Sequence, residues 1–473
     1  MAIPHIPALR RGQNYTSLDK TEIKNVRTGE IVAEVSQVNA GLIKRDMRHS
    51  KRSALASLTT AQLLEISKRA GDLFMEGTLP VGDSGTQSAQ DYLESLSATS
   101  GLPHSLIRKN MAKIYEVFTE MSTILGGLTR GMDLDIIDKG AGRQNGVPVS
   151  FFPTTQELGV VLPSNSPGVN SLWMPAIALK TPVVLKPGRE EPWTPFRIIQ
   201  AFIAAGCPAE AFSFYPTDHE GSGTILQTCG RALIFGDVKT VERYASNPAV
   251  EVHGPGYSKI ILGDDKVDNY EAYLDIIVKS IVENGGRSCI NASAVIVPRK
   301  GEEIANAIAK RLAQVVPLSY TDPNAILSGF ANPAMAEFIN STLTEDLKTP
   351  GATDVTAQYR ASERLVQYGG STYLLPTVVY CQKNTHSLAN REFLFPYASV
   401  LEVPQSEIAE KIGPSLVVTL ISNDESFVKQ MMDSPHVERL NIGAIPTMKV
   451  QWDQPHEGNL FEFLYRRRSI QWA

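Results

Sequence analysis

The chain has 473 residues, of which 42% are hydrophobic and 20% charged, and its formal net charge is -5. This length predicts two or three domains with a sizeable core. The negative balance excludes the basic excess needed to neutralise phosphates, so we expect no nucleic-acid partner. No uncharged apolar run approaches the ~18 residues of a membrane span, and no signal peptide is recognisable. We therefore expect a cytoplasmic protein that binds no membrane.

The four cysteines are widely separated and form no Cys-x-x-Cys pair. This spacing argues against a zinc site and against a secreted disulfide framework, and we expect no metal. Free cysteines are usually buried and inert, which is the interpretation for Cys207, Cys229 and Cys381. Cys289 differs because the stretch Gly-Gly-Arg-Ser leads into it and an apolar strand follows.

The first 130 residues or so are predicted to be mainly helical. Thr60–Glu76 places leucine and phenylalanine at helical spacing behind a threonine cap. Residues 80–88 are rich in Gly, Ser and Asp and predict a loop, and helical periodicity resumes over residues 105–125.

From Leu158 onwards, short apolar runs alternate with helical stretches. Strands are predicted over residues 158–162, 182–185, 211–215, 232–235, 292–297 and 416–421. Helices are predicted over residues 171–179, 195–205, 270–283 and 302–316. This alternation indicates βαβ units and a parallel sheet, so the sequence predicts two closely connected α/β domains.

Four motifs follow one another in the chain. They are Val161-Leu-Pro-Ser-Asn-Ser-Pro-Gly168, Pro182-Val-Val-Leu-Lys-Pro-Gly188, Asn284-Gly-Gly-Arg-Ser-Cys289 and Glu392-Phe-Leu-Phe-Pro396. In order and spacing they resemble the aldehyde dehydrogenase superfamily, from about Gln156 to the C-terminus. The resemblance implies an α/β fold with a Rossmann-like cofactor-binding domain, an α/β catalytic domain and a small β oligomerisation extension.

The domain boundaries follow from the same resemblance. We expect the cofactor-binding domain, with a helical N-terminal part, over residues 1–257 and the catalytic domain that carries Cys289 over residues 258–445. Residues 446–473 form the C-terminal oligomerisation segment, and residues 138–155 are a candidate part of the extension. Closed symmetric assemblies are common, so we expect a homodimer or homotetramer.

The resemblance also implies residue roles. Cys289 attacks the aldehyde carbonyl to give a thiohemiacetal, and hydride transfer to a nicotinamide leaves a thioester; a thiolate suits both steps. The Asn165 amide is the oxyanion donor, together with the backbone N–H of Cys289. Lys186 ends a predicted parallel strand, at the edge where dinucleotides bind. The expected cofactor-binding residues are Ser164, Lys186, Arg189, Gly236 and Glu392.

One departure from the family pattern concerns the general base. Hydrolytic members carry a glutamate before Leu-Gly-Gly-Lys, and an ungapped match puts Val252 at that position. A one-residue insertion would put Glu251 there, and His253 is a third candidate. Without a base, water attacks the thioester poorly. Coenzyme A is then a candidate co-substrate, as in acylating dehydrogenases and acyl-CoA reductases, which residues 235–241 also resemble.

Two further departures bear on cofactor and loop shape. Many NAD-dependent members have an acidic residue three positions after the motif lysine, whereas this chain has Arg189, which can pair with a 2′-phosphate. NADP is therefore favoured over NAD, although Glu190 and Glu191 stand beside the arginine. Phe395 stands where the family more often has glycine.

The C-terminal segment over residues 460–471 resembles the family's closing strand, which pairs across a subunit interface. The expected function is oxidation of a small aldehyde, or reduction of an acyl thioester, with NAD(P). A catalytically silent scaffold or cofactor-binding subunit is the alternative from another class.

Overall fold

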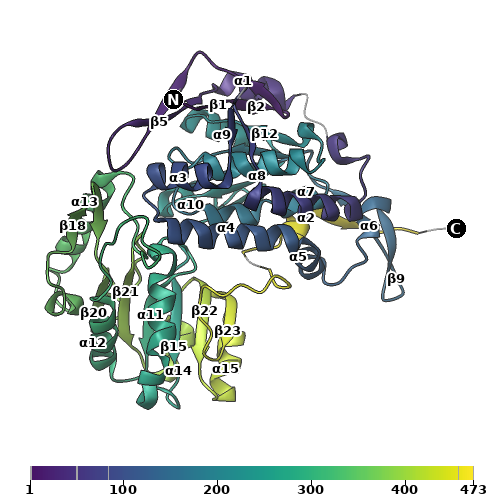
Figure 1. Ribbon diagram of the computed structural model, residues 1–473. Coiled ribbons are helices and arrows are strands. Elements are labelled where there is room, and N and C mark those ends of the chain that lie inside the picture. Colours follow the sequence, from purple (N-terminus) through teal and green to yellow (C-terminus); the bar gives the residue numbers. More distant parts are fainter. Residues whose placement is uncertain (1–2, 49–51, 84, 456, 472–473) are drawn as a thin grey trace. The chain divides into compact units, whose positions relative to one another are not determined.

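The computed structural model describes residues 3–48, 52–83, 85–455 and 457–471, and the chain forms two compact units (Figure 1). The first unit comprises Met1–Thr99, Ile107–Gly254 and Gln451–Ala473. The second comprises Ser100–Leu106 and Pro255–Val450. No helix in the described part of the chain is long and apolar enough to cross a membrane.

A seven-stranded sheet forms the centre of the first unit, in the order β14-β13-β10-β11-β12-β2-β3. Its strands are β2 (Ala8–Arg10), β3 (Gln13–Tyr15), β10 (Leu158–Val161), β11 (Val183–Lys186), β12 (Phe212–Phe214), β13 (Arg231–Phe235) and β14 (Val250–His253). The strands from β14 to β12 are parallel, and β2 joins β12 antiparallel. The chain runs outward from β10 through β11 and β12, then returns to the other side of β10 as β13. Ligands of such sheets bind beyond the carboxyl ends of the strands at this switch point.

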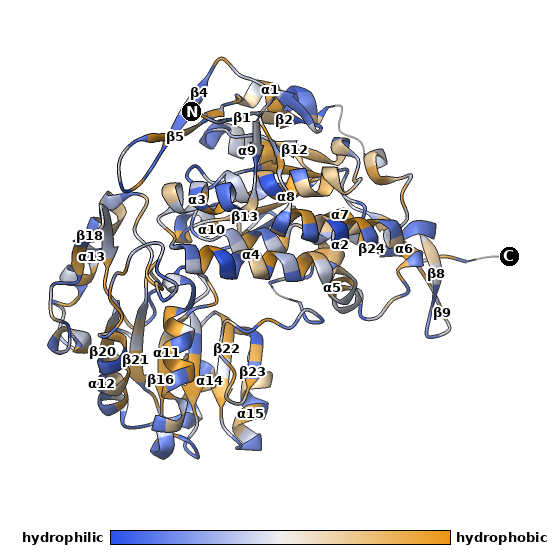
Figure 2. Cartoon of the chain, in the orientation of Figure 1, coloured by the Kyte–Doolittle hydropathy of each residue, from blue (hydrophilic) through white to orange (hydrophobic). Residues whose placement is uncertain are grey.

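Helices pack around this sheet. They are α1 (Ala40–Met47), α2 (Thr60–Glu76), α3 (Ala89–Ser100), α4 (His104–Thr119), α5 (Met121–Leu128), α6 (Asp135–Lys139), α7 (Pro175–Ala178), α8 (Trp193–Ala204), α9 (His219–Thr228), α10 (Val238–Tyr244) and α16 (Leu460–Leu464). The predicted helix Thr60–Glu76 is confirmed with its cap, because Thr59 and Gln62 form a reciprocal capping box. Orange and blue residues alternate along α2 and α4 in Figure 2, as expected for helices with one buried face.

The N-terminal region is less helical than predicted. Strands β1 (His5–Ile6), β4 (Lys20–Lys24) and β5 (Ile31–Ser36) form a separate sheet in the order β1-β5-β4. Residues expected to form a loop instead form a hairpin of β6 (Leu79–Val81) and β7 (Gly85–Gln87). These strands are short and their pairing partners lie elsewhere in the chain, so local periodicity does not reveal them.

The C-terminal segment returns to the first unit as a helix followed by a strand. Helix α16 occupies the first half of the segment expected to be a strand, so that part of the prediction is wrong. Strand β24 (Tyr465–Arg468) pairs antiparallel with β9 (Val147–Pro153) of the same chain, which also pairs with β8 (Ala141–Gln144). This three-stranded sheet is the small β extension.

The second unit also contains a seven-stranded sheet, in the order β17-β20-β21-β16-β15-β22-β23. Its strands are β15 (Ser258–Leu262), β16 (Ala292–Val297), β17 (Ala352–Asp354), β20 (Thr377–Cys381), β21 (Tyr397–Glu402), β22 (Ser415–Ile421) and β23 (Val437–Ile442), and a hairpin of β18 (Leu365–Tyr368) and β19 (Ser371–Leu374) lies beside it. All pairings are parallel except that of β17 with β20.

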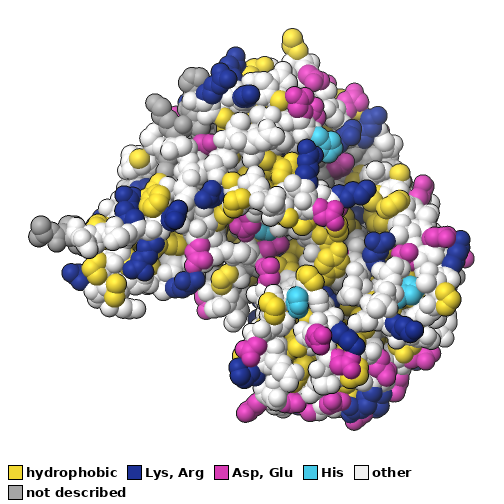
Figure 3. Space-filling model, turned by 180° about the vertical axis from the view of Figure 1, so that it is seen from behind, with side chains coloured by type: hydrophobic (Ala, Val, Ile, Leu, Met, Phe, Trp, Pro, Cys, Tyr) yellow, Lys and Arg dark blue, Asp and Glu magenta, His cyan; other side chains and the backbone are white. Residues whose placement is uncertain are grey.

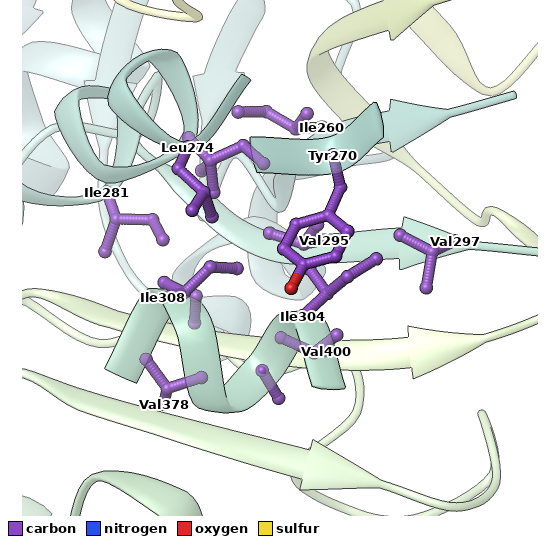
Figure 4. Close-up of a cluster of buried hydrophobic side chains, with 14 of the residues drawn as sticks. Ile260, Tyr270, Leu274, Ile281, Val295, Val297, Ile304, Ile308, Val378 and Val400 are labelled. Atoms are coloured by element: carbon purple, nitrogen blue, oxygen red, sulfur yellow. The ribbon is translucent and has the colours of Figure 1, made fainter. Parts of the chain in front are cut away.

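Successive residues of these strands enter two different cores, because side chains alternate between the faces of a sheet. Ile260 packs with Val295 and Val400 against α11 (Leu274–Val282) and α12 (Gly301–Leu312), as Figure 4 shows. The neighbours of these residues face the core formed with helices α13 (Pro333–Asp346), α14 (Gln405–Lys411) and α15 (Glu425–Met432). Burial on both faces explains the unbroken apolar runs in the sequence.

Charged side chains of both signs intermingle on the face drawn in Figure 3.

Candidate functional site

The loop before Cys289 adopts a conformation that its glycines make possible. Asn284, Gly285 and Gly286 all have positive φ angles, of 52°, 67° and 67°. The Asn284 side chain tolerates this region and donates from Nδ2 to Ser288 Oγ at 2.8 Å. A Cβ on Gly286 would collide with the backbone of Pro396, so two motifs far apart in sequence pack directly on each other.

Cys289 is the half-buried cysteine of this chain, whereas the other three, all within the described residues, are buried. Burial raises the pKa of Cys207 and of Cys381 to about 12 and that of Cys229 well above its ordinary value. A raised pKa suppresses the reactive thiolate, so these three thiols are unsuited to nucleophilic attack.

The backbone of Cys289 is fixed from the segment that precedes β15. Ser258 Oγ donates to the Cys289 carbonyl at 2.8 Å. A Cβ on Gly256 would collide with the same carbonyl, so only glycine allows this approach. The nucleophile segment and the segment 256–259 therefore form one packed assembly inside the second unit.

Asn291 is a site residue that the sequence reasoning missed. Its Oδ1 accepts from the backbone N–H of Ser288 at 2.9 Å, and its Nδ2 donates to the carbonyls of Ser280 at 3.0 Å and Glu283 at 2.9 Å. The side chain thereby joins the end of α11 to the turn that carries Cys289. The signal available in the sequence was an asparagine two residues after the candidate nucleophile.

Glu392 lies in the same assembly. Its Oε2 accepts from the backbone N–H of Tyr257 at 2.7 Å, and Tyr257 has a positive φ of 46°. Lys259 Nζ donates to the Tyr257 carbonyl at 2.7 Å and to Ser415 Oγ at 2.8 Å. Burial lowers the pKa of Lys259 to about 7, opposed by the charge of Glu392. The carboxylate is thus held by backbone whose shape a buried lysine maintains.

Phe395, at the position where the family often has glycine, is buried. Its ring lies 6.1 Å from that of Phe393 and 6.2 Å from that of Tyr397. An aromatic cluster therefore shapes the Glu392 loop, in place of the backbone freedom that glycine would give.

In the first unit, the segments after β10 and β11 meet at the carboxyl edge of the sheet. A Cβ on Gly188 would collide with Ser164 Oγ and the Pro163 carbonyl, and Ser164 Oγ accepts from the Glu190 N–H at 3.3 Å. Asn165 is half-buried in the first of these segments. Lys186 ends β11, and burial lowers its pKa against the opposing charge of Glu190.

The two glutamates beside Arg189 occupy different environments. Arg189 is exposed, whereas Glu191 is 2% exposed and accepts from the Thr194 N–H at 2.9 Å at the start of α8. Burial raises the pKa of Glu191 to about 8. Glu191 thus points inward and leaves Glu190 as the acidic neighbour of Arg189 at this edge.

Gly236 follows β13 at the switch point of the sheet. The next residue, Asp237, caps α10, its Oδ1 accepting from the Thr240 N–H at 2.9 Å. The hydroxyl of Thr240 donates to the same oxygen, and the two bonds hold the pKa of the Asp237 carboxyl below its usual value. A carboxylate therefore occupies a helix start of the kind that often receives phosphate.

The three base candidates on β14 lie on opposite faces of the strand. Val252 packs against an apolar cluster that includes Val161 and Leu226. Glu251 and His253 point to the other face, where they line a hollow with Glu457 of the C-terminal segment. Glu457 was not recognised in the sequence, because nothing near it in the chain marks it.

Comparison with known proteins agrees with this arrangement. The model of the aldehyde dehydrogenase family matches residues 15–458, nearly the whole chain. The chain belongs to the aldehyde dehydrogenase family. The predicted family, enzyme class and fold class are thereby confirmed: the protein is an oxidoreductase of the aldehyde dehydrogenase fold.

Several aldehyde dehydrogenases are similar to this chain at low identity. The 5-carboxymethyl-2-hydroxymuconate semialdehyde dehydrogenase of Escherichia coli is 21% identical, over 82% of this chain and 81% of that protein. The malonate-semialdehyde dehydrogenase of Bacillus pumilus is 22% identical, over 83% and 78%. The structure of the aldehyde dehydrogenase from Bacillus cereus in complex with NAD+ superposes with a TM-score of 0.78 at 16% identity, covering 98% of this chain and 96% of that one.

Proposed function

We propose that this aldehyde dehydrogenase oxidises a small aldehyde with NAD(P) through a thioester on Cys289. The observation that carries the proposal is the packed assembly of the second unit. In it the half-buried Cys289 is held by Ser258 and Gly256, while Glu392 is held by Tyr257. The other cysteines are buried and have raised pKa values.

The chemistry begins with a bond from the Cys289 sulfur to the aldehyde carbon, which leaves negative charge on the carbonyl oxygen. The resemblance assigns this charge to the Asn165 amide and the Cys289 N–H, donors of a kind whose loss costs about 10²–10³ in rate. Loss of hydride from the thiohemiacetal carbon then leaves the thioester. The bonds to Ser258 and Asn291 keep the nucleophile's backbone fixed during both steps.

The residues of the first unit fit a nicotinamide dinucleotide. Gly188 packs closely against Ser164 at the carboxyl edge of the sheet, and Lys186 and Gly236 stand at the ends of the two strands that flank β10. Lys186 and Glu392 would hold the two ribose groups through their hydroxyls, since charge-assisted hydrogen bonds are strong. When bound, the cofactor supplies the hydride acceptor.

NADP is favoured over NAD because Arg189 is exposed while Glu191 is turned inward. A guanidinium can pair with the 2′-phosphate bidentately. The test is the ratio of kcat/KM for NADP to that for NAD in the parent and in Arg189→Ala. We expect a fall of about tenfold or more in the ratio, as befits a lost charge-assisted pair; an unchanged ratio would remove Arg189 from the cofactor site.

A second candidate is the acylating reaction, in which coenzyme A takes the acyl group from Cys289. The observation in its favour is Val252, which occupies the ungapped base position and packs in an apolar cluster. In reverse, the same thioester would serve an acyl-CoA reductase.

The experiment measures the formation of reduced nicotinamide from a panel of aldehydes with NAD or NADP, each with and without coenzyme A. Protein taken from the reaction mixture is then digested, and the peptide that contains Cys289 is examined by mass spectrometry for an acyl group. Turnover in the parent and none in Cys289→Ala is the expected result. Undiminished turnover in Cys289→Ala would refute the proposal.

We also propose that the β extension mediates a homodimer or homotetramer. Its outer strands β8 and β24 have edges that face away from β9, and open edges favour pairing with another chain. Arg466, Arg467 and Arg468 are exposed along β24. Light scattering on the parent and on an Arg467→Pro variant measures the oligomeric state. A monomeric parent would exclude a homodimer or homotetramer.

A further inference from the structure

A buried arginine lies two residues before the nucleophile. Arg287 belongs to the motif that ends at Cys289, and it is 6% exposed. Burial lowers the pKa of its guanidinium to about 10, so the group still carries its positive charge at neutral pH. A buried charge is costly unless hydrogen bonds replace the lost water. The bonds that Arg287 makes therefore determine where its side chain, and the turn attached to it, can lie.

The guanidinium of Arg287 donates to two backbone carbonyls from different parts of the chain. Its Nη1 donates to the Ser100 carbonyl at 3.2 Å, and its Nη2 donates to the Gly329 carbonyl at 2.5 Å. The central carbon of the guanidinium lies 5.4 Å from the centre of the Phe330 ring, in a cation–π contact. One planar side chain thus joins the nucleophile motif to residues that lie 187 positions before it and 42 positions after it.

The two acceptor segments are themselves bonded to each other. The segment Ser100–Leu106 belongs to the second unit, although the chain on either side of it belongs to the first. The Gly329 N–H donates to the Gly101 carbonyl at 3.0 Å, and the His104 N–H donates to the Tyr320 carbonyl at 2.9 Å. The two carbonyls that receive the guanidinium are therefore held beside each other within the second unit.

Glycine at position 101 makes this contact possible. Gly101 has a φ of 74°, and a Cβ there would collide with the Gly329 carbonyl, which is one of the two acceptors of the guanidinium. A substitution at position 101 therefore displaces the acceptor while the arginine itself stays in the chain.

Cys289 lies in a short turn that is anchored from several sides. The Asn291 N–H closes the turn by donating to the Ser288 carbonyl at 2.9 Å, and Ser258 holds the Cys289 carbonyl. Arg287 is the residue through which the chain enters this turn. Two glycines precede it, and glycine has more backbone freedom than any other residue. The side chain of Arg287 offsets this freedom at the start of the turn.

We propose that Arg287 is a positioning residue for Cys289, and that its forked guanidinium, rather than its charge alone, fixes the turn that carries the nucleophile. This inference rests on the proposed function and deepens it. As the Cys289 sulfur bonds to the aldehyde carbon, the Cys289 N–H must already point at the carbonyl oxygen, on which negative charge develops. A lysine would keep the charge, but its single nitrogen lacks the planar fork that spans two carbonyls in fixed directions.

The test compares Arg287→Lys, Arg287→Met and Gly101→Ala with matched controls in the second unit. Arg311→Lys makes the same change at an exposed arginine. Gly369→Ala places an alanine at another positive φ, of 54°, where a Cβ meets no atom within 4 Å. The first control accounts for the exchange of arginine for lysine, and the second for the backbone strain of an alanine at positive φ.

Single-turnover oxidation measures the steps at Cys289 without the release that follows them. Enzyme saturated with NADP or NAD is mixed in increasing excess with hexanal, benzaldehyde or succinic semialdehyde, whichever the parent oxidises fastest. The formation of reduced nicotinamide gives a maximal rate and a half-saturating concentration. Amide hydrogen exchange of the peptide that contains Cys289 measures how often the turn opens and needs no substrate. Urea unfolding reports whether each variant is folded.

We expect Arg287→Lys and Arg287→Met to lower the maximal rate by about tenfold or more, because a displacement of about 1 Å can cost about 10²-fold. The half-saturating concentration should change by less than about twofold, since the guanidinium does not contact the aldehyde. Gly101→Ala should lower the maximal rate as well, and hydrogen exchange in the Cys289 peptide should be faster in all three variants. Both controls should match the parent in rate and in exchange.

Several results would overturn the inference. A parental rate in folded Arg287→Lys, with a loss in Arg287→Met alone, would assign the role to the charge rather than to the fork. Faster exchange at a parental rate would show that the anchor has no part in the reaction. Should Arg287→Lys fail to fold, equal rates in Gly101→Ala and Gly369→Ala would decide against the inference. A parent that oxidises none of the three aldehydes would refute the proposed function, whereas unchanged exchange in every variant would refute the anchor itself.

Discussion

Replacement of Asn291 tests whether one side chain holds the nucleophile segment in place. The residue is 6% exposed, and its side chain makes four hydrogen bonds to backbone, to Ser288, Ser280, Ile281 and Glu283. Asn291→Ala removes all four and leaves one N–H and three carbonyls without this partner. A single hydrogen bond contributes about 0.5–1.5 kcal/mol, and a buried polar group left unpaired costs about 1–3 kcal/mol. We expect a net loss of about 2–4 kcal/mol, because relaxation of the turn satisfies some of these groups.

The loss is measured as the change in the free energy of unfolding of the second unit in urea. The matched control is Asn269→Ala, an exposed asparagine of the same unit, for which we expect less than about 0.5 kcal/mol. The rate of alkylation of Cys289 by iodoacetamide is followed in the same samples, and it should change in Asn291→Ala alone. If Asn291→Ala unfolded at the same urea concentration as the parent and Cys289 kept its alkylation rate, the reasoning would be refuted.

Three further predictions concern charge. Burial lowers the pKa of Lys259 from 10.5 to about 7, so between these pH values the unfolded chain binds a proton that the folded chain does not. The free energy of unfolding of the second unit should therefore rise with pH in this range. Urea unfolding of Lys259→Met at several pH values should lack that rise, and an equal rise in both proteins would contradict the assignment. Asp237→Asn keeps a capping side chain and removes a negative charge at the switch point. The Kd for NAD(P), measured by calorimetry, should therefore fall several-fold. Weaker binding would mean that the carboxylate contacts the cofactor favourably. At pH 8 a maleimide should label Cys289 well before the other thiols, because their pKa values are raised by burial; peptide mapping that finds another cysteine labelled first would contradict this. The more slowly labelled residues should be Cys207, Cys229 and Cys381.

Local chemistry determined much of this protein in advance. Strands buried on both faces leave unbroken apolar runs, and the run at Ala292–Val297 predicted β16 to the residue. A threonine cap followed by helical spacing did the same for Thr60–Glu76. Both are features of a single segment, in which the side chains that define the element lie within a few residues of one another.

Pairing over long sequence separations was decided only by the tertiary structure. Strand β5 is a short apolar run interrupted by Glu34, and it forms because β1 and β4 supply its hydrogen bonds. The segment expected as a closing strand begins as a helix, since α16 packs on the first unit before β24 reaches β9. Strand formation depends on a partner that no window of sequence contains.

The candidate site divides in the same way. Cys289 stood out in the sequence because glycines that permit positive φ lead into it, and the chain itself carries that signal. Neither the bond from Ser258 to its carbonyl nor the anchoring by Asn291 could be inferred from motif spacing. Glu457 is the clearest example, because no residue near it in the sequence predicts that it lies beside His253. It acquires its place beside His253 only because folding returns that segment to β14, where a glycine leaves room for it.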